Sequence, residues 1–404
     1  MIYQAFEAQM AVVDLMRPFA AMAATTMRLP WPSFLSKLLR GTAGDLDAFA
    51  GLRITARRPA FAIEPVLVGN ALVAVTEEVV ATTAFATLLR FKKDLAVAQP
   101  KVLLVAPMSG HFATLLRATI QTMLIDHDVY VTDWHNIRDV PRGAGCFDLS
   151  TYVQEIIHFL HVLGEGTHLM AVCQPAVPAL AAAALMAEDD DPALPRSLTL
   201  MAGPIDTRIN PTTVNKLASE KPIGWFERNL IDRVPAGYTG AGRRVYPGFV
   251  QLTAFLSMNL ERHKAAFAEM SAALSQGDAP RYAKLQAFYE EYLAVMDLAA
   301  DFYLETVRLV FQDHALPKGE LKISGRTVDP KAIRRLSLLT VEGERDDICG
   351  LGQTMAAQDL CTGVRQYRKT HHVQTGVGHY GVFSGRRWTN EIYPFVRDTI
   401  AMAS

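Results

Sequence analysis

The chain has 404 residues, of which 50% are hydrophobic and 20% are charged. This composition is ordinary for a globular protein and excludes wholesale disorder, while a formal net charge of −1 gives no electrostatic reason to expect a nucleic-acid partner. The four cysteines show no C-x-x-C spacing, which argues against a zinc site and against a disulfide framework. We expect no metal ion and no cofactor.

Residues 1–60 are expected to form an N-terminal helical segment that packs on the body of the protein. Apolar residues recur here at steps of three or four, which is typical of an amphipathic helix: Phe6, Met10, Val13 and Met16. Contact between this segment and an apolar surface is the alternative interpretation.

Neither a signal peptide nor a membrane span is expected. The N-terminus lacks a basic region and carries Glu7 and Asp14 early, unlike a secretory signal. The longest clean apolar run, residues 175–187, is too short to cross a bilayer. We therefore expect a soluble protein of the cytoplasm, with no transmembrane segment.

A regular alternation of strands and helices begins after this segment. From Phe61 to Lys93 the pattern is typical of β-structure, with a turn at Gly69 and Asn70. Continuous apolar strands then alternate with helical patterns, and we expect these strands at 101–108, 127–134, 167–173 and 197–204. This alternation predicts a mostly parallel sheet with helices on both faces. Residues 61–204 would form the first part of that α/β core.

Helical patterns dominate residues 205–334, which predicts a helical cap, or lid, inserted into the core. The alternation resumes with an apolar strand within 335–347 and a last strand within 364–374, followed by a C-terminal helix. Residues 335–404 would therefore complete the α/β core.

A single cysteine stands where a strand pattern becomes a helix pattern, in LMAVCQPAVPALAAAALMA (169–187). Such a strand-to-helix turn is where α/β-hydrolases expose their nucleophile, and the small side chain of Ala171 suits this tight turn. Pro175 suits the first turn of a helix. We predict that Cys173 is a nucleophile; the alternative is a buried structural cysteine.

A cysteine nucleophile needs a base, and the base needs an orienting carboxylate. In this fold the chain order is nucleophile, acid, histidine. Asp346 and Asp347 follow the next-to-last strand, and His379 lies in a glycine-flanked loop after the last strand. Residue types in the three required places predict a Cys–His–Asp triad, although spacing leaves the choice between the two aspartates open.

An oxyanion hole needs two backbone N–H groups directed at the developing charge. Gln174, the residue after Cys173, should supply one. The loop APMSGHFATLLR should supply the other, from Ser109 or Gly110, and we take Ser109 as the donor. Other polar residues near these places are expected to be structural, solvated or substrate-binding rather than catalytic: His111, Glu342, Glu344, His371, His372 and the remaining cysteines, Cys146, Cys349 and Cys361.

The chain resembles the intracellular polyhydroxybutyrate depolymerases over almost its whole length, and least in the first 50 or so residues. The strings that carry the resemblance are DWHNIRDVP, AVCQPAVPALAAAALMA, LMAGPIDTRINPTTVN, VYPGFVQLTAFLSMN, FYEEYLAVMDLAADFYLETV, LLTVEGERDDICGLGQT and GHYGVF.

The resemblance implies an α/β-hydrolase in which Cys173, Asp346 and His379 form the triad, and it favours Asp346 over Asp347. It also implies action on poly(3-hydroxybutyrate) at the surface of cytoplasmic storage granules. Attack by Cys173 would leave an acyl thioester, whose hydrolysis would release 3-hydroxybutyrate or short oligomers.

Three alternatives stay open in the sequence. Coenzyme A could accept the acyl group in place of water, giving 3-hydroxybutyryl-CoA. A polyester synthase uses the same residue types, but synthases usually resemble G-x-C-x-G where this chain has Ala171 and Pro175. A non-catalytic granule-binding protein would have no need of the triad.

The substrate groove and the oligomeric state are less well defined. A groove for an uncharged polyester should be mostly apolar, and the cap offers large side chains as candidates for its wall: Trp225, Phe226, Phe249, Phe255 and Met258. The sequence does not locate the surface that contacts the granule. It is compatible with a homo-oligomer.

Overall fold

An eight-stranded sheet forms the centre of the protein in a computed structural model, which describes residues 2–27, 42–43, 45–47, 51–95, 98–258 and 260–404. Its strand order is β15-β14-β8-β7-β5-β6-β4-β3. The pairs from β15 to β6 are parallel, whereas β4 and β3 are added antiparallel at one edge. The strands are β3 (Val75–Thr82), β4 (Ala86–Lys93), β5 (Lys101–Val105), β6 (Asp128–Trp134), β7 (His168–Val172), β8 (Ser197–Met201), β14 (Ser337–Gly343) and β15 (Lys369–Gln374).

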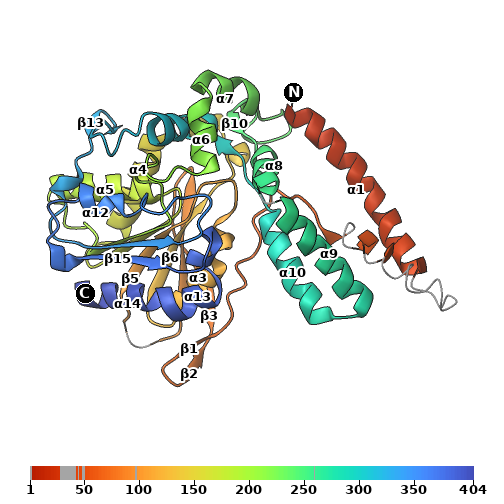
Figure 1. Cartoon of the computed structure of the whole chain (residues 1–404), viewed down its shortest axis with the longest axis horizontal. Coiled ribbons are helices and arrows are strands. Elements are labelled where there is room, and N and C mark those ends of the chain that lie inside the picture. The colour runs from red at the N-terminus through yellow and green to blue at the C-terminus, as the bar shows by residue number, and fades with distance from the viewer. Residues whose placement is uncertain (1, 28–41, 44, 48–50, 96–97, 259) are drawn as a thin grey trace.

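The inner strands are buried along their whole length. Every residue of β7, β8 and β14 is buried, which explains why their sequences are continuous apolar runs rather than alternating ones. Helices cover both faces of the sheet (Figure 1), namely α3 (Arg117–Met123), α4 (Leu149–Leu163), α5 (Ala176–Glu188), α12 (Ala356–Leu360) and α14 (Tyr393–Ala403). The predicted parallel sheet with helices on both faces is confirmed.

Between β8 and β14 the chain leaves the sheet and forms a mainly helical insertion. Its helices are α6 (Thr213–Glu220), α7 (Ile223–Leu230), α8 (Gly248–Met258), α9 (Leu260–Gln276), α10 (Ala279–Tyr292), α11 (Ala300–Thr306) and a π-helical turn over Val307–Gln312. A small antiparallel sheet, β11-β10-β9, joins them through strands at Asp232–Arg233, Arg244–Tyr246 and Leu298–Ala299. Strands of two or three residues are too short to give a period of two, so the sequence analysis did not detect them.

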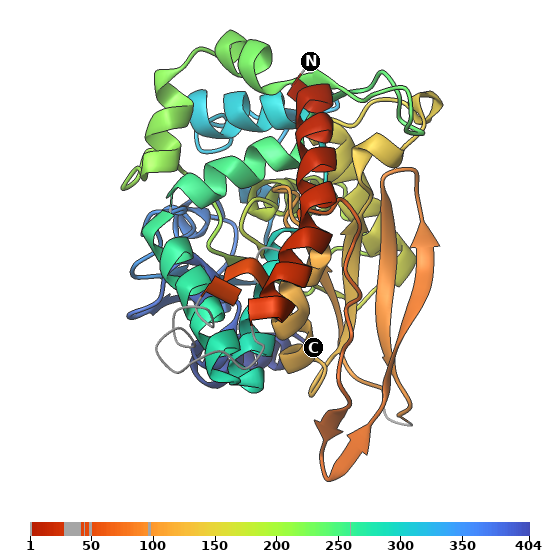
Figure 2. The same ribbon diagram turned by 90° about the vertical axis from the view of Figure 1, so that its right-hand side faces the viewer.

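The N-terminal helix α1 (Ile2–Met27) lies along the outside of this insertion (Figures 1 and 2). The hydroxyl of Tyr3 donates to Asp297 Oδ2 at 2.9 Å, and the ring of Phe6 stacks on Phe249 of α8 with centroids 3.8 Å apart. The expected N-terminal segment, 1–60, falls partly outside the described residues. None of the described helices is both long and apolar enough to cross a membrane.

Two short hairpins lie outside these units. Strands β1 (Val66–Val68) and β2 (Ala71–Val73) pair around the Gly69–Asn70 turn, as the sequence predicted. Strands β12 (Lys322–Ile323) and β13 (Arg326–Thr327) form the second hairpin.

Gly203 gives a test of the packing between the sheet and α5. A Cβ on this residue would lie 2.1 Å from the Cβ of Ala176 and 3.1 Å from the carbonyl oxygen of Cys173. Gly203→Ala should therefore force β8 and α5 apart and lower the free energy of unfolding by about 1–3 kcal/mol. Thermal melting measures this. Gly143→Ala is the matched control, because a Cβ there meets nothing within 4 Å; equal melting temperatures for both variants would contradict the prediction.

Candidate active site

Cys173 lies in a strained turn between β7 and α5. Its φ is +67°, in the left-handed region that costs a non-glycine residue about 1–3 kcal/mol and persists only where its surroundings hold it. The Cys173 N–H donates to the carbonyl of Met201 at 2.7 Å, and its own carbonyl accepts from the Ala176 N–H at 3.1 Å. The side chain of Cys173 lies at the end of β7, where it lines a cavity. This strand–turn–helix geometry is that of a nucleophile elbow.

Asp346 and His379 meet beside this turn, from loops that follow β14 and β15. His379 Nδ1 and Asp346 Oδ2 are 2.8 Å apart, and their side chains are 5% and 1% exposed. The other oxygen, Oδ1, accepts from the backbone N–H groups of Ile348 and Cys349 at 2.9 and 2.8 Å. Asp346 is therefore the aspartate that contacts His379, whereas Asp347 is exposed.

The pKa of His379 is raised well above its ordinary value. Burial of the ring lowers this pKa, but the negative charges of Cys173 and Asp346, and the hydrogen bonds to both, raise it by more. Beside Cys173 and Asp346 the ring of His379 therefore favours its protonated form. A histidine held against a carboxylate is the partner that a cysteine nucleophile requires.

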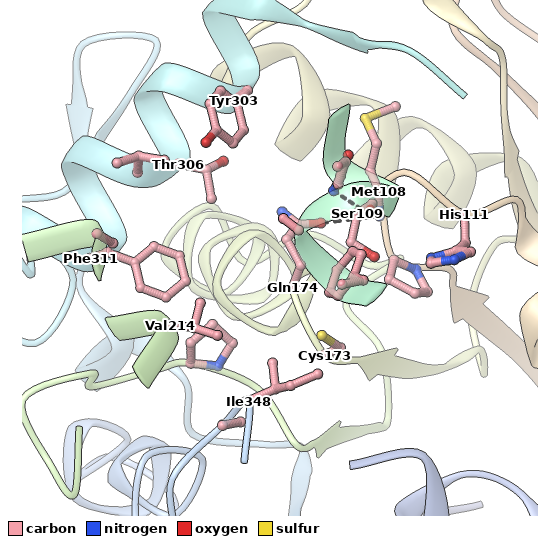
Figure 3. A pocket seen from close by; sticks show the side chains of 18 of the residues that line it. Met108, Ser109, His111, Cys173, Gln174, Val214, Tyr303, Thr306, Phe311 and Ile348 are labelled. Carbon is pink, nitrogen blue, oxygen red and sulfur yellow. Dashed lines mark hydrogen bonds between the residues drawn. The ribbon is translucent and has the colours of Figure 1, made fainter. Parts of the chain in front are cut away.

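One backbone N–H of the loop after β5 is directed at the Cys173 turn. The Met108 N–H donates to Gln174 Oε1 at 3.3 Å, so this amide is directed toward the elbow (Figure 3). The carbonyl of Ser109 accepts from Gln251 of α8, and the carbonyl of Gly110 accepts from Met296 N–H at 2.7 Å. The predicted oxyanion donor of this loop, Ser109 or Gly110, stays a prediction, and Met108, two residues before Gly110, is a further candidate because of the direction of its N–H.

Three other histidines near the predicted site, His111, His371 and His372, have hydrogen-bond partners outside the Cys173–His379–Asp346 group. His111 Nε2 lies 3.1 Å from the carbonyl of Tyr292, and complete burial lowers its pKa to about 4, so its ring is neutral in the cavity wall. His371 Nδ1 contacts Thr340 Oγ1 at 2.9 Å, and His372 Nε2 contacts Gln374 Oε1 at 3.0 Å. Both belong to β15.

Glu342 is buried at the end of β14 and organises the loop that carries Asp346. Its carboxylate accepts from the backbone N–H groups of Gly352, Thr354 and Met355, at distances from 2.7 to 3.1 Å. Cys349, in the same loop, lines the cavity, and burial raises the pKa of its thiol well above the ordinary value. The loop thus holds a second, neutral thiol beside the site, a position that its sequence pattern does not indicate.

A cavity of about 290 Å³ opens above Cys173, and His379 contributes to its lining. Most of its wall comes from the helical insertion (Figure 3). Representative lining residues are Val214 of α6, Phe226 of α7, Phe255 of α8, Tyr303 and Thr306 of α11, and Phe311. Two of the expected wall residues, Phe226 and Phe255, line the cavity. Phe249 packs on α1 instead, and Trp225 does not contribute to the lining. The side chain of Met258 is outside the described part of the chain. The described residues contain no cluster of three or more potential metal ligands.

Comparison with solved structures finds distant hydrolases. A 2-hydroxy-6-oxo-6-phenylhexa-2,4-dienoate hydrolase from Rhodococcus sp. strain RHA1 is 12% identical, with 81% of this chain and 99% of that chain covered and a TM-score of 0.46. A hydrolase from Pseudomonas aeruginosa PA01 is 13% identical over 81% and 97% of the two chains, with a TM-score of 0.44. An esterase from Thermogutta terrifontis is 14% identical over 81% and 99%, with a TM-score of 0.42. No curated protein matches the chain.

The sheet topology identifies the fold independently of these distant likenesses. A mostly parallel eight-stranded sheet carries a strained strand-to-helix turn at Cys173 after one strand, and an aspartate and a histidine in contact after two later strands, which is the α/β-hydrolase arrangement. Residues 202–404, half of the chain, match the family described as PHB de-polymerase C-terminus. The chain therefore belongs to the PHB depolymerase C-terminus family, on an α/β-hydrolase fold.

Proposed function

We propose that this protein is a depolymerase that hydrolyses ester bonds of poly(3-hydroxybutyrate) through a cysteine nucleophile. Membership of the family supports ester hydrolysis as the reaction class. The observation that carries the proposal is the buried hydrogen bond between His379 and Asp346, at 2.8 Å, beside the strained Cys173 turn. A substrate of this kind places the enzyme at polyester granules in the cytoplasm.

The reaction would run in two halves. The Cys173 thiolate attacks an ester carbonyl carbon, and the resulting oxyanion is stabilised by backbone N–H groups. His379, held by Asp346, then gives its proton to the departing alkoxide, which leaves a 3-hydroxyacyl thioester on Cys173. In the second half His379 removes a proton from water, the hydroxide attacks the thioester, and the Cys173 thiolate leaves as the imidazolium forms again.

The two oxyanion donors in this proposal are the amides of Gln174 and Met108. Met108 replaces Ser109 as our choice because its N–H already donates to an oxygen at the elbow, the Oε1 atom of Gln174. That side-chain oxygen has the same chemistry as a substrate carbonyl. An incoming ester would take its place on the Met108 amide.

The cavity suits the proposed substrate. Poly(3-hydroxybutyrate) is uncharged and carries methyl branches, so its recognition needs apolar contact with few polar groups. The insertion supplies such contact through Phe226, Phe255 and Phe311, and Cys173 lies at the cavity wall where an ester group could reach it.

Cys173→Ala tests the proposed nucleophile. With amorphous poly(3-hydroxybutyrate) granules and mass spectrometry of the soluble products, the wild-type protein should release free 3-hydroxybutyrate or its oligomers, and Cys173→Ala should release none above background. Cys146→Ala is the matched control and should behave like wild type, because Cys146 is exposed and absent from the cavity lining.

Two results would change this proposal. Equal release by wild type and Cys173→Ala would rule out Cys173 as the nucleophile. A parallel reaction with coenzyme A identifies the acyl acceptor: 3-hydroxybutyryl-CoA formed only in that reaction, without free acid, would make the protein a thiolytic transferase.

Asp346→Asn tests the charge arrangement through the pH dependence of stability. A histidine whose folded pKa is raised stabilises the folded state fully below its unfolded value, about pH 6.5, and this contribution is lost as the pH rises through the folded pKa. The carboxylate of Asp346 is one cause of the raised pKa of His379. The difference in free energy of unfolding between wild type and Asp346→Asn should therefore be larger near pH 6 than near pH 9.

Urea denaturation at the two pH values measures this difference. Asp347→Asn is the matched control, since the neighbouring carboxylate is exposed, and it should show little dependence of this kind. If the Asp346→Asn difference grew with pH instead, the imidazolium would not be stabilised by Asp346.

A further inference from the structure

Helix α1 turns a row of large apolar side chains outward. Val12, Leu15, Met16, Phe19 and Met22 are between 55% and 68% exposed. Their spacing of three and four residues places them on one face of the helix, which we call the outer face of α1. The opposite side of the helix packs on the insertion through Tyr3 and Phe6.

No charged residue belongs to the outer face. The charged residues of α1 are Glu7, Asp14 and Arg17, and the helical period of 3.6 residues places all three on the other side. There Glu7 accepts from the hydroxyl of Tyr238 at 2.5 Å, and Arg17 is buried and donates to Asp14 at 2.8 Å. The outer face is therefore both apolar and electrically neutral.

A face that is both apolar and neutral suits some binding partners better than others. A helix that binds an anionic lipid surface normally carries Lys or Arg on its polar face, but the single cation of α1 is the buried Arg17. A protein partner is typically recognised through a polar rim around an apolar centre. A solid polyester has no charge to match and presents methyl and ester groups, which suits a neutral apolar face.

We propose that the outer face of α1 is the surface through which this protein docks on solid poly(3-hydroxybutyrate). The inference rests on the proposed function, since that function supplies the polymer. Scattered exposed apolar side chains are normal on proteins, whereas a row of them along one neutral helix face marks an interaction site.

Docking through α1 would hold the polymer on the insertion that also lines the cavity. Phe6 stacks on Phe249 of α8, and the Asp297 carboxylate that accepts from Tyr3 also accepts from Gly248 N–H, at the start of α8, at 2.9 Å. The same helix lines the cavity through Gln251 and Phe255. Figure 2 shows α1 on the outside of the molecule, beside these helices. Attachment there would raise the effective concentration of polymer chains near Cys173.

The double variant Leu15→Glu, Phe19→Glu tests the proposal. Binding is measured by sedimentation with poly(3-hydroxybutyrate) granules in a Cys173→Ala background, so that no hydrolysis is needed to observe it. We expect affinity to fall by about tenfold or more, because burial of one large apolar side chain is worth at least this factor. In the Cys173 background, hydrolysis of a soluble ester, p-nitrophenyl butyrate, should be unchanged by the double variant.

Leu67→Glu, Leu72→Glu is the matched control. These leucines are 57% and 72% exposed on the β1–β2 hairpin, so the control removes as much exposed apolar surface elsewhere. It should bind granules like the Cys173→Ala parent. An equal loss of binding in the control, or no loss in the α1 variant, would overturn the proposal.

Two further measurements identify a different occupant of the outer face. Light scattering gives the oligomeric state: a wild-type dimer that the α1 variant converts to monomer, with granule binding unchanged, would assign this face to a second copy of the chain. Wild-type binding to phosphatidylcholine vesicles as tight as its binding to granules would assign it to lipid. Failure of the proposed function is distinguishable from all of these, since it would leave granule binding intact while no ester was cleaved.

Discussion

The left-handed backbone of Cys173 is the constraint on which the site depends. A non-glycine residue keeps φ at +67° only because its neighbours leave no relaxed alternative. The N–H of Cys173 donates to the carbonyl of Met201 in the adjacent strand β8. Helix α5 begins three residues after Cys173, at Ala176, and Gly203 packs closely against this first residue of the helix. The thiol is thus positioned by the packing of β7, β8 and α5, so its direction is a property of the core rather than of a mobile loop.

The other members of the site are held by backbone hydrogen bonds in loops. The carboxylate of Glu342 accepts hydrogen bonds from three backbone N–H groups of the segment that follows β14, and Asp346 accepts two more. These bonds leave one oxygen of Asp346 free to accept from His379, because Oδ1 is already used within the loop. The buried carboxylate of Glu342 therefore orders the loop in which Asp346 contacts His379.

Whether a feature of the fold or of the candidate site could be predicted from the sequence depends on whether local or distant contacts determine it. The buried strands and the elbow were predictable, because continuous apolar runs and a cysteine at a strand-to-helix transition are local signals. Spacing left the choice between Asp346 and Asp347 open, and only the family resemblance favoured Asp346, because both follow the same strand and the loop hydrogen bonds decide which side chain faces His379. For the same reason spacing does not decide between Ser109 and Met108 as the proposed oxyanion donor, because the direction of an amide depends on contacts distant in sequence.

Helix α8 shows why the insertion is more than a cover for the cavity. From its inner side Gln251 donates to the Ser109 carbonyl, beside the amide of Met108, and the contact is close enough that a Cβ on Gly110 would meet the Gln251 side chain at 2.5 Å. On the outer side of α8 the ring of Phe249 stacks on Phe6 of α1. A displacement of α8 would therefore move the loop that contains Met108, Ser109 and Gly110, so the geometry around Cys173 depends on the insertion as well as on the sheet.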